Sequence, residues 1–211
     1  MTSQLSDHAL IESLNWRYAV KRFDATRKIS SQHVNALEQV LGLNPPSYVI
    51  QPYHFYMIDD QALRTELTLA SYGQPQIIEC SLLVVFTIFK NLDRAYVDRL
   101  IAHTAVAQKV PIEPLARYRQ LIIGGLIDGP RHGWIKEWSA RQAYLSLGNL
   151  LTSAATLGID ACPMEGFDSA QYDEILKLSP HDLSTVVVCA LGYRSTQDRH
   201  VQDLKVRLLA K

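Results

Sequence analysis

Residues 134–158 read WIKEWSARQAYLSLGNLLTSAATLG, and this stretch carries the strongest information about the fold. The sequence predicts one long helix here, with apolar side chains on nearly every side. These side chains are Trp134, Ile135, Trp138, Tyr144, Leu145, Leu147, Leu150, Leu151 and Leu157. A helix of this kind has to be buried, either in a core or in a subunit interface. In a chain of 211 residues it favours an obligate homodimer.

Shorter elements are predicted on both sides of this helix. Helical spacing of apolar residues predicts helices over residues 5–16, 31–42, 93–108 and 112–123. Asp168, with Gln171 three residues later, resembles a capping box and predicts the start of a helix over residues 169–178. Apolar and β-branched runs predict strands over residues 54–58, 82–89 and 185–191. No repeat or linker divides the chain, so we expect a single domain over residues 1–211. The sum is an α+β fold, or a three-layer sandwich, with more helix than strand.

The composition argues against several classes of protein. Hydrophobic residues make up 47% of the chain, and 21 basic residues balance 21 acidic ones. A nucleic-acid binder usually carries a basic excess, and this chain has none. The longest apolar run, residues 82–89, is far shorter than the roughly 18–20 residues of a membrane helix, and the first residues lack the pattern of a secretory signal. We therefore expect a cytoplasmic protein that binds neither nucleic acid nor membrane.

The three cysteines, Cys80, Cys162 and Cys189, are widely spaced and have apolar neighbours. No CxxC pair occurs, and the seven histidines show no metal-ligand spacing, so no metal site is predicted. The cysteines are best interpreted as reduced thiols that pack as small hydrophobic residues. A catalytic cysteine is the weaker alternative.

Two basic segments could bind an anion. If residues 16–24 are extended, Arg17, Ala19 and Lys21 point one way, while the alternate residues point the other way. Two cations with a small residue between them could receive a phosphate and an adjacent electron-rich group. Lys205 and Arg207 repeat this spacing near residue 206. Taken alone, each segment is better explained as a solvated basic turn or an ordinary basic tail, since most exposed lysines and arginines have no special role.

Residues 160–168, DACPMEGFD, form the third piece. Pro163 fixes one backbone angle and Gly166 lets the backbone approach a ligand closely, so the N–H groups near Glu165 and Gly166 could serve as donors. The alternative is a plain tight loop between two helices. No GxGxxG or GxxxxGK[ST] motif occurs, so basic side chains rather than a glycine-rich turn would have to hold a nucleotide.

In this order, the pieces resemble the FMN-dependent nitroreductase family, in particular its oxygen-insensitive NAD(P)H nitroreductase branch. The resemblance runs nearly end to end, and the P-x-E-G-F-D stretch at 163–168 is its most specific part. The other matching residues are Arg17, Lys21, Phe23 and Asp24, residues 51–55, Gln142, Tyr144, Leu145, Gly148 and Asn149, residues 157–161, Gly192, Tyr193, Lys205 and Arg207.

The resemblance implies a three-layer α/β/α sandwich with a central, mostly antiparallel sheet, in an intertwined homodimer. It implies FMN as cofactor and NADH or NADPH as reductant. The implied reaction is the ping-pong, two-electron reduction of nitroaromatics, quinones or related small electron acceptors. Two alternatives stay open: a related flavin or enone reductase, and a flavin-binding sensor on the same fold that does not turn over.

The resemblance also assigns roles to single residues. Arg17, Lys205 and Arg207 would bind the FMN phosphate, and Lys21 would lie at the N1/O2 edge of the flavin. The backbone of Glu165 and Gly166 would face flavin N5, which makes Lys21, Glu165 and Gly166 the implied catalytic group. The further cofactor-binding positions are Tyr18, Ala19, Ser47 (from the partner subunit), Gly73, Gln76, Gln142 (near the ribityl chain), Pro163 and Met164.

The chain departs from the family pattern at five positions. Ala19 replaces a serine that would bind phosphate, and Val49 replaces an asparagine before the Q-P motif. Gly73 and Gln76 stand where the oxygen-insensitive branch has an asparagine and a lysine at the pyrimidine edge. Gly124 falls at or near an aromatic residue that covers the substrate pocket in that branch. We therefore expect a more open pocket than in that branch.

Overall fold

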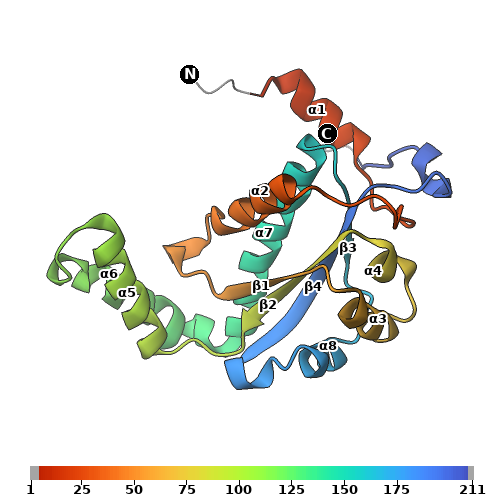
Figure 1. The fold of residues 1–211 in the computed structure, drawn as a ribbon. Coiled ribbons are helices and arrows are strands. Elements are labelled where there is room, and N and C mark those ends of the chain that lie inside the picture. The colour runs from red at the N-terminus through yellow and green to blue at the C-terminus, as the bar shows by residue number, and fades with distance from the viewer. Residues whose placement is uncertain (1–4, 209–211) are drawn as a thin grey trace.

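The computed structural model describes residues 5–208 and contains a sheet of four strands between two layers of helices (Figure 1). The spatial order of the strands is β1 (Tyr53–Ile58), β2 (Leu82–Phe89), β4 (Leu183–Gly192) and β3 (Asp160–Met164). Every neighbouring pair is antiparallel. The two central strands are buried along nearly their whole length, which explains why both are continuous apolar runs.

Helices α2 (Ser31–Gly42) and α7 (Ile135–Thr156) cover one face of the sheet. Helices α3 (Gln61–Leu69), α4 (Pro75–Glu79) and α8 (Ser169–Ile175) cover the other face (Figure 1). Side chains of β2 alternate between the two layers, because successive residues of a strand point to opposite faces. Leu82, Val84 and Phe86 pack against α2 and α7, whereas Leu83 and Val85 pack against the opposite layer. The predicted three-layer α/β/α sandwich with an antiparallel sheet is confirmed.

The long helix α7 is only partly buried within one chain. Leu147 and Leu150 lie in the core beside the sheet. On the opposite side, Tyr144 and Leu145 remain 38% and 46% exposed. The helix ends before Gly158, which has a φ of +68°. Its all-round apolar character therefore reflects one side in the core and another side that the described chain leaves open.

Helices α5 (Arg94–Gln108) and α6 (Ala116–Ile122) project from the sheet as a separate arm (Figure 1). Their apolar side chains form a cluster of their own with the start of α7. Helix α1 (Asp7–Trp16) begins after the cap residue Ser6 and packs on α7. Shorter turns of 3₁₀ helix occupy Ser47–Val49, Glu113–Leu115, Pro130–Trp134, Ser179–His181 and Arg199–Gln202, and a π-helical turn occupies Ile123–Ile127.

Three elements differ from the sequence-based expectation. Residues 160–168 were expected to form a loop, but the first five of them form strand β3, which pairs with β4. β3 lies at an edge of the sheet. Proline has no backbone N–H to donate, and an edge strand such as β3 tolerates Pro163 because one of its sides has no neighbouring strand to pair with. Helices α3 and α4 have no counterpart in the predicted elements; both are short, and α4 starts with a proline.

The predicted start of α8 is confirmed in detail. The Asp168 carboxylate accepts hydrogen bonds from the backbone N–H groups of Ala170 and Gln171. The Gln171 side chain donates back to Asp168 at 2.8 Å. Among residues 5–208, no helix is long and apolar enough to cross a bilayer. The single domain expected over residues 1–211 includes residues 1–4 and 209–211, which lie outside the described part.

Candidate active site

The segment after α1 runs beside strand β3. Ala19 forms an isolated parallel bridge with Ala161, and the Val20 N–H donates to the Ala161 carbonyl at 3.4 Å. Val20 is completely buried, while Lys21 is exposed, as expected for an extended segment in which successive residues alternate. The segment therefore brings its cationic side chains to the β3 edge of the sheet.

Arg194 braces this segment against the sheet. Its guanidinium forms an ion pair with the buried carboxylate of Asp160, at the start of β3, with an N–O distance of 2.5 Å. The same guanidinium lies over the ring of Trp16 at 4.2 Å and over the ring of Tyr18 at 4.7 Å. Each such cation–π contact adds about 0.5–1 kcal/mol at a partly exposed site.

Three cations from two distant segments of the chain, Arg17 on one and Lys205 and Arg207 on the other, lie near one another. The Lys205 ammonium donates to the backbone carbonyls of Leu14 and Arg17. Burial lowers the pKa of Lys205, and the nearby charges of Arg17 and Arg207 lower it further. The Arg17 Nε atom is buried and has no hydrogen-bond partner among the described residues. Mutually repelling cations with an unpaired donor suit an anionic ligand.

Lys21 and Gln76 lie near the Cys162 thiol, on the side of this cation cluster. Burial raises the pKa of Cys162, and this rise is partly offset by the Lys21 charge, by a hydrogen bond from Gln76 and by the Arg17 charge. Gln76 is 5% exposed, and its side-chain oxygen has no partner in the described chain. Arg17, Lys21 and Gln76 therefore surround one position beside β3.

A clamp holds the Glu165–Gly166 turn from two sides. The Tyr144 hydroxyl, from α7, donates to the Glu165 carboxylate at 2.5 Å. The Gln74 side-chain amide, from the cap of α4, donates to the Gly166 carbonyl at 2.5 Å. A Cβ atom at position 166 would lie 3.2 Å from that amide nitrogen, so glycine gives Gln74 the room it needs. Gly73, with a φ of +71°, turns the chain just before Gln74.

Ser47 and Gln142 form a second, separate pair. The Ser47 N–H donates to the Gln142 side-chain oxygen at 3.0 Å. Immediately after Ser47, Tyr48 and Val49 have φ angles of +58° and +53°. Within residues 5–208, no hydrogen bond or ion pair joins this pair to the Arg17 cluster.

The loop around Gly124 lies near the same segment. Gly124 sits in the π-helical turn, and a Cβ atom at the adjacent Gly125 would lie 3.0 Å from the Tyr48 hydroxyl. The Tyr118 hydroxyl, from α6, donates to the Tyr48 carbonyl at 2.6 Å. The departures at Val49 and Gly124 therefore occur in neighbouring parts of the structure: Val49 follows Tyr48, which contacts the helical arm, and Gly124 lies in the turn directly after α6.

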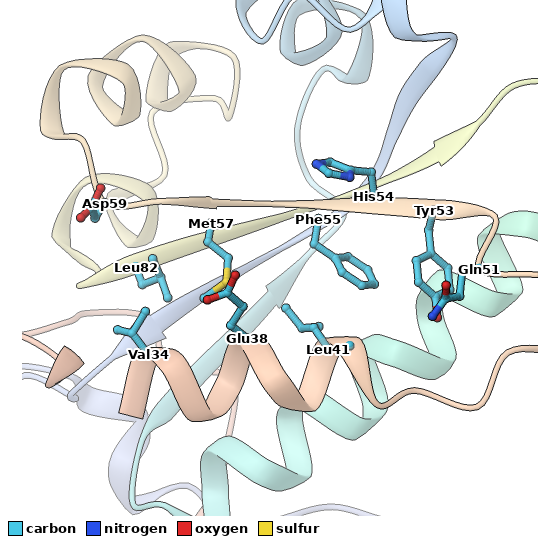
Figure 2. Close-up of a pocket in the computed structure, with 11 residues that line it drawn as sticks. Val34, Glu38, Leu41, Gln51, Tyr53, His54, Phe55, Met57, Asp59 and Leu82 are labelled. Carbon is cyan, nitrogen blue, oxygen red and sulfur yellow. The ribbon is translucent and has the colours of Figure 1, made fainter. Parts of the chain in front are cut away.

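Two of the cavities in the described chain bear on where a phosphate could bind. A groove of about 500 Å³ separates α2 from the outer edge of β1. Figure 2 shows Tyr53, Phe55 and Met57 pointing toward α2, while His54 points to the other side of the strand. The ionisable groups nearest the groove include the carboxylates Glu38 and Asp59 but no lysine or arginine, so it does not suit a phosphate. A cavity of about 610 Å³ lies beside Lys21, between residues 21–22 and 197–200.

The cysteines offer no activated nucleophile. Burial raises the pKa of all three thiols, Cys80, Cys162 and Cys189, and none is paired in a disulfide. A thiol with a raised pKa stays protonated, which favours the interpretation of these residues as small hydrophobic side chains. Within the described residues, His, Cys, Asp and Glu side chains form no group of three that could hold a metal ion.

Comparison with known proteins identifies the family of this chain. A model described as the nitroreductase family matches residues 14–193. The chain belongs to the nitroreductase family. A protein of Staphylococcus epidermidis, named as an NAD(P)H nitroreductase, is 30% identical over 212 residues, covering 92% of this chain and 91% of that protein.

Solved structures of nitroreductase-like proteins share the fold. A nitroreductase of Exiguobacterium sibiricum, crystallised in complex with FMN, superposes with a TM-score of 0.79 at 22% identity, covering 99% of this chain and 96% of that chain. An enone reductase of gut-bacterial fatty acid saturation metabolism gives a TM-score of 0.75 at 18% identity, covering 93% of each chain. At these identities the likeness shows the nitroreductase fold and no more.

The structure brings most of the residues that the sequence singled out into two groups. The first group contains Arg17, Tyr18, Ala19, Lys21, Gln76, Lys205 and Arg207. The second contains Gly73, Pro163, Met164, Glu165 and Gly166, where β3 and the turn after α3 meet. Ser47 and Gln142 stay apart as their own pair. Sequence reasoning missed Gln74 and Asp198, and gave Tyr144 no role.

Proposed function

We propose that this chain is an FMN-dependent NAD(P)H oxidoreductase, which reduces nitroaromatics, quinones or related small electron acceptors by a ping-pong, two-electron mechanism. The observation that carries the proposal is the meeting of Arg17, Lys205 and Arg207. Within residues 5–208, none of the three forms an ion pair with a carboxylate. Such a cluster suits a phosphate, because guanidinium and ammonium groups bind its oxygens through charge-assisted hydrogen bonds.

The residues present fit FMN in two further respects. The buried, unpaired Nε of Arg17 and side-chain oxygen of Gln76 need a polar partner, since an unsatisfied buried polar group costs about 1–3 kcal/mol. Phosphate oxygens suit the Arg17 donor, and a ring N–H suits the Gln76 acceptor. The FMN complex of the Exiguobacterium sibiricum nitroreductase and the name of the Staphylococcus epidermidis relative support the same choice.

Hydride uptake from NAD(P)H and two-electron delivery to an acceptor are the chemistry that FMN supplies when bound. In our proposal, Lys21 holds a positive charge at the pyrimidine edge of the ring and stabilises the negative charge that builds up there. The backbone of Glu165 and Gly166 would lie beside the ring nitrogen that exchanges hydride. Tyr144 and Gln74 keep that turn in place. The chain thus contributes positioning and electrostatics, without a protein nucleophile.

The remaining positions would line the cofactor. They are Tyr18 and Ala19 beside the phosphate, Gly73 and Gln76 at the pyrimidine edge, Pro163 and Met164 along the ring, Gln142 near the ribityl chain, and Ser47 from a partner subunit. Because Ala19 lacks the hydroxyl that the family uses on the phosphate, more of the phosphate binding falls to the three cations.

A homodimer is part of this proposal. Tyr144 and Leu145 on α7 are exposed, as are Ile11, Leu14 and Trp16 on α1, the helix that packs against α7. Exposed apolar side chains on neighbouring helices are typical of a subunit interface. Light scattering coupled to gel filtration should give twice the chain mass. We also propose a cytoplasmic location, because three buried free cysteines fit a reducing compartment.

The proposal is tested by a visible spectrum and a reductive titration. The purified protein, or the protein after incubation with FMN and desalting, should show flavin absorbance. Under anaerobic conditions, NADH or NADPH should bleach that absorbance, and a nitroaromatic or quinone should restore it. A preparation that stays colourless after incubation with FMN would contradict the proposal.

Two alternatives give different results in the same assay. A flavin-binding sensor, which the departures at Ala19, Val49 and Gly73 motivate, would bind FMN but would not be bleached by either nicotinamide. An enone or flavin reductase would be bleached, yet its absorbance would return fastest with an enone or a free flavin. A panel of acceptors with one reductant separates these from a nitroreductase.

A further inference from the structure

Asp198 is a buried carboxylate that lies between the two basic segments. Only 2% of the residue is exposed. It precedes the short helix at Arg199–Gln202, and its Oδ1 atom caps that helix by accepting the His200 N–H at 3.0 Å. Capping the helix uses only one of the two carboxylate oxygens and does not require the residue to be buried. The burial of the residue and the direction of its second oxygen call for another explanation.

The second oxygen of Asp198 binds the segment that carries Arg17 and Lys21. Oδ2 accepts the backbone N–H of Lys21 at 2.7 Å and that of Arg22 at 3.2 Å. It also accepts the Tyr18 hydroxyl at 3.1 Å. One carboxylate therefore ties the strand-like segment to the stretch that continues to Lys205 and Arg207.

The charge of Asp198 is maintained by these contacts. Burial alone would raise the pKa of this carboxyl group, but the backbone hydrogen bonds from His200, Lys21 and Arg22 and the bond from Tyr18 outweigh it, so the pKa lies below its ordinary value. Its carboxylate also raises the pKa of the Tyr18 phenol, after burial itself, so that Tyr18 remains a donor. Asp198 is thus an ionised acceptor at neutral pH, with donors from both segments.

The placement of a negative charge here is informative. A carboxylate next to a site for an anion weakens the binding of that anion by Coulomb repulsion. Lys21 and Arg17 would attract FMN more strongly if Asp198 were neutral. A buried carboxylate in this position is therefore explained by the way in which its hydrogen bonds position the two basic segments, and not by a favourable effect of its charge on the ligand.

We propose that Asp198 is a positioning residue of the cofactor site, which fixes the Lys21 backbone and holds the Arg17–Lys21 and Lys205–Arg207 segments in the relative arrangement that a flavin phosphate and ring require. This inference rests on the proposed function. It assigns to Asp198 an effect on both ends of the cofactor, through the phosphate cations at one end and Lys21 at the other. In this proposal Asp198 acts through the two segments that it joins and not through a contact of its own with the ligand.

The test uses Asp198→Asn. A purely electrostatic role of Asp198 and a positioning role predict opposite effects of this substitution. If Asp198 acts only as a nearby charge, neutralising it tightens FMN binding and raises the reduction potential of the bound flavin. If it positions the two segments, FMN binds at least about tenfold more weakly, and the potential falls because Lys21 no longer stabilises the reduced ring. The dissociation constant is measured by quenching of flavin fluorescence, and the potential by equilibration with a reference dye.

Asp203→Asn is the matched control. Asp203 lies on the same stretch, is exposed, pairs only with His200 in the described chain, and loses the same charge when substituted. We expect its FMN affinity and potential to stay near those of the unmodified protein. Hydrogen exchange gives a readout that does not depend on flavin. The Lys21 and Arg22 amides should exchange faster in Asp198→Asn than in the unmodified protein, and their exchange rates should be unchanged in Asp203→Asn.

If Asp198→Asn does not fold, Tyr18→Phe replaces it, since this change removes one donor to Asp198 and no charge. Because Tyr18 is also placed beside the phosphate, its readout is hydrogen exchange of the flavin-free protein: the Lys21 and Arg22 amides should exchange faster in Tyr18→Phe, and unchanged exchange would contradict the inference. FMN binding by Asp198→Asn that is equal to or tighter than normal would overturn the inference, and so would equal losses in Asp198→Asn and Asp203→Asn. An unmodified protein that binds no FMN would instead overturn the proposed function, and this inference with it.

Discussion

The side-chain ammonium of Lys205 donates a hydrogen bond to the backbone carbonyl of Arg17, 188 positions earlier in the sequence. This contact places the C-terminal basic pair against the N-terminal one, where Lys205 and Arg17 lie close enough for the Arg17 charge to lower the pKa of Lys205. Two like charges are held together although they repel each other. The repulsion is relieved when an anion binds between them, which is the physical basis of the proposed phosphate site.

Arg207→Gln tests the phosphate site. We expect FMN to bind about tenfold to 100-fold more weakly, since a charge-assisted hydrogen bond contributes about 1.5–3 kcal/mol and Arg207, exposed in the described chain, is free to make one. Riboflavin, which lacks the phosphate, should bind both proteins equally. Fluorescence titration measures both constants. Arg117→Gln, an exposed arginine on α6, is the control for loss of one positive charge. An equal loss for riboflavin would show that Arg207 does not act on the phosphate.

Lys21→Ala tests the charge at the ring. We expect hydride transfer from NAD(P)H to slow at least about tenfold, because the developing negative charge loses its partner. FMN affinity should fall less than the rate. Stopped-flow reduction at saturating NADH or NADPH gives the rate, and Lys28→Ala, another exposed lysine, is the control. An unchanged rate would leave Lys21 with a purely structural role.

Glu165→Gln tests whether the carboxylate or the backbone of residue 165 matters. We expect kcat/KM to change by less than about threefold, because the glutamine side-chain oxygen can still accept the hydrogen bond from Tyr144. Steady-state kinetics with NADH and a quinone measure it. Complete loss of turnover in a folded, yellow Glu165→Gln protein would show that the carboxylate takes part in the reaction.

Val49→Asn should stabilise the protein. Val49 has a φ of +53° and is 62% exposed, so its backbone is strained and its side chain contributes little packing. Asparagine tolerates this left-handed conformation, and we expect a gain of about 1 kcal/mol, or a Tm about 2–4 °C higher for a chain of this size. Val106→Asn, an exposed position within α5, is the matched control and should be nearly neutral. A lower Tm for Val49→Asn would mean that packing of the valine side chain outweighs the strain of its backbone.

The stability contributed by Asp198 should depend on pH. Its pKa in the folded protein is lower than its ordinary value, so its contribution is complete above that ordinary value and is lost as the pH falls through the lowered pKa. The difference in unfolding free energy between the unmodified protein and Asp198→Asn should therefore shrink as the pH is lowered from about 6 to about 3. Urea unfolding of the flavin-free proteins measures the difference. A gap that widens toward acid would contradict the assignment.

Local sequence signals predicted the elements that depend on local physics. Strands β2 and β4 were predicted because their buried residues form continuous apolar runs, and α7 because its apolar residues cover most of its surface. Strand β3 was missed because its five residues include Pro163 and begin with an aspartate. That aspartate, Asp160, is buried only because Arg194 neutralises it, and no local pattern shows such a distant pair.

The same limit applies to the candidate site. Arg17, Lys21, Lys205 and Arg207 could be named in advance because their spacing matches a known family. Asp198, Gln74 and Tyr144 act through hydrogen bonds to segments far away in the sequence, with no characteristic spacing to mark them. A buried carboxylate that caps a short helix and also binds another segment becomes visible only when the fold is known.

The order in which these segments are synthesised has a consequence for the nascent protein. Arg17 and Lys21 leave the ribosome early, while Asp198, Lys205 and Arg207 leave it almost two hundred residues later. The last strand, β4, ends at Gly192, only six positions before Asp198, so the sheet is completed at nearly the same time as the later group becomes available. The complete sheet and the complete cation cluster therefore need almost the same length of synthesised chain, so in our proposal flavin is loaded late, when the fold itself is being completed.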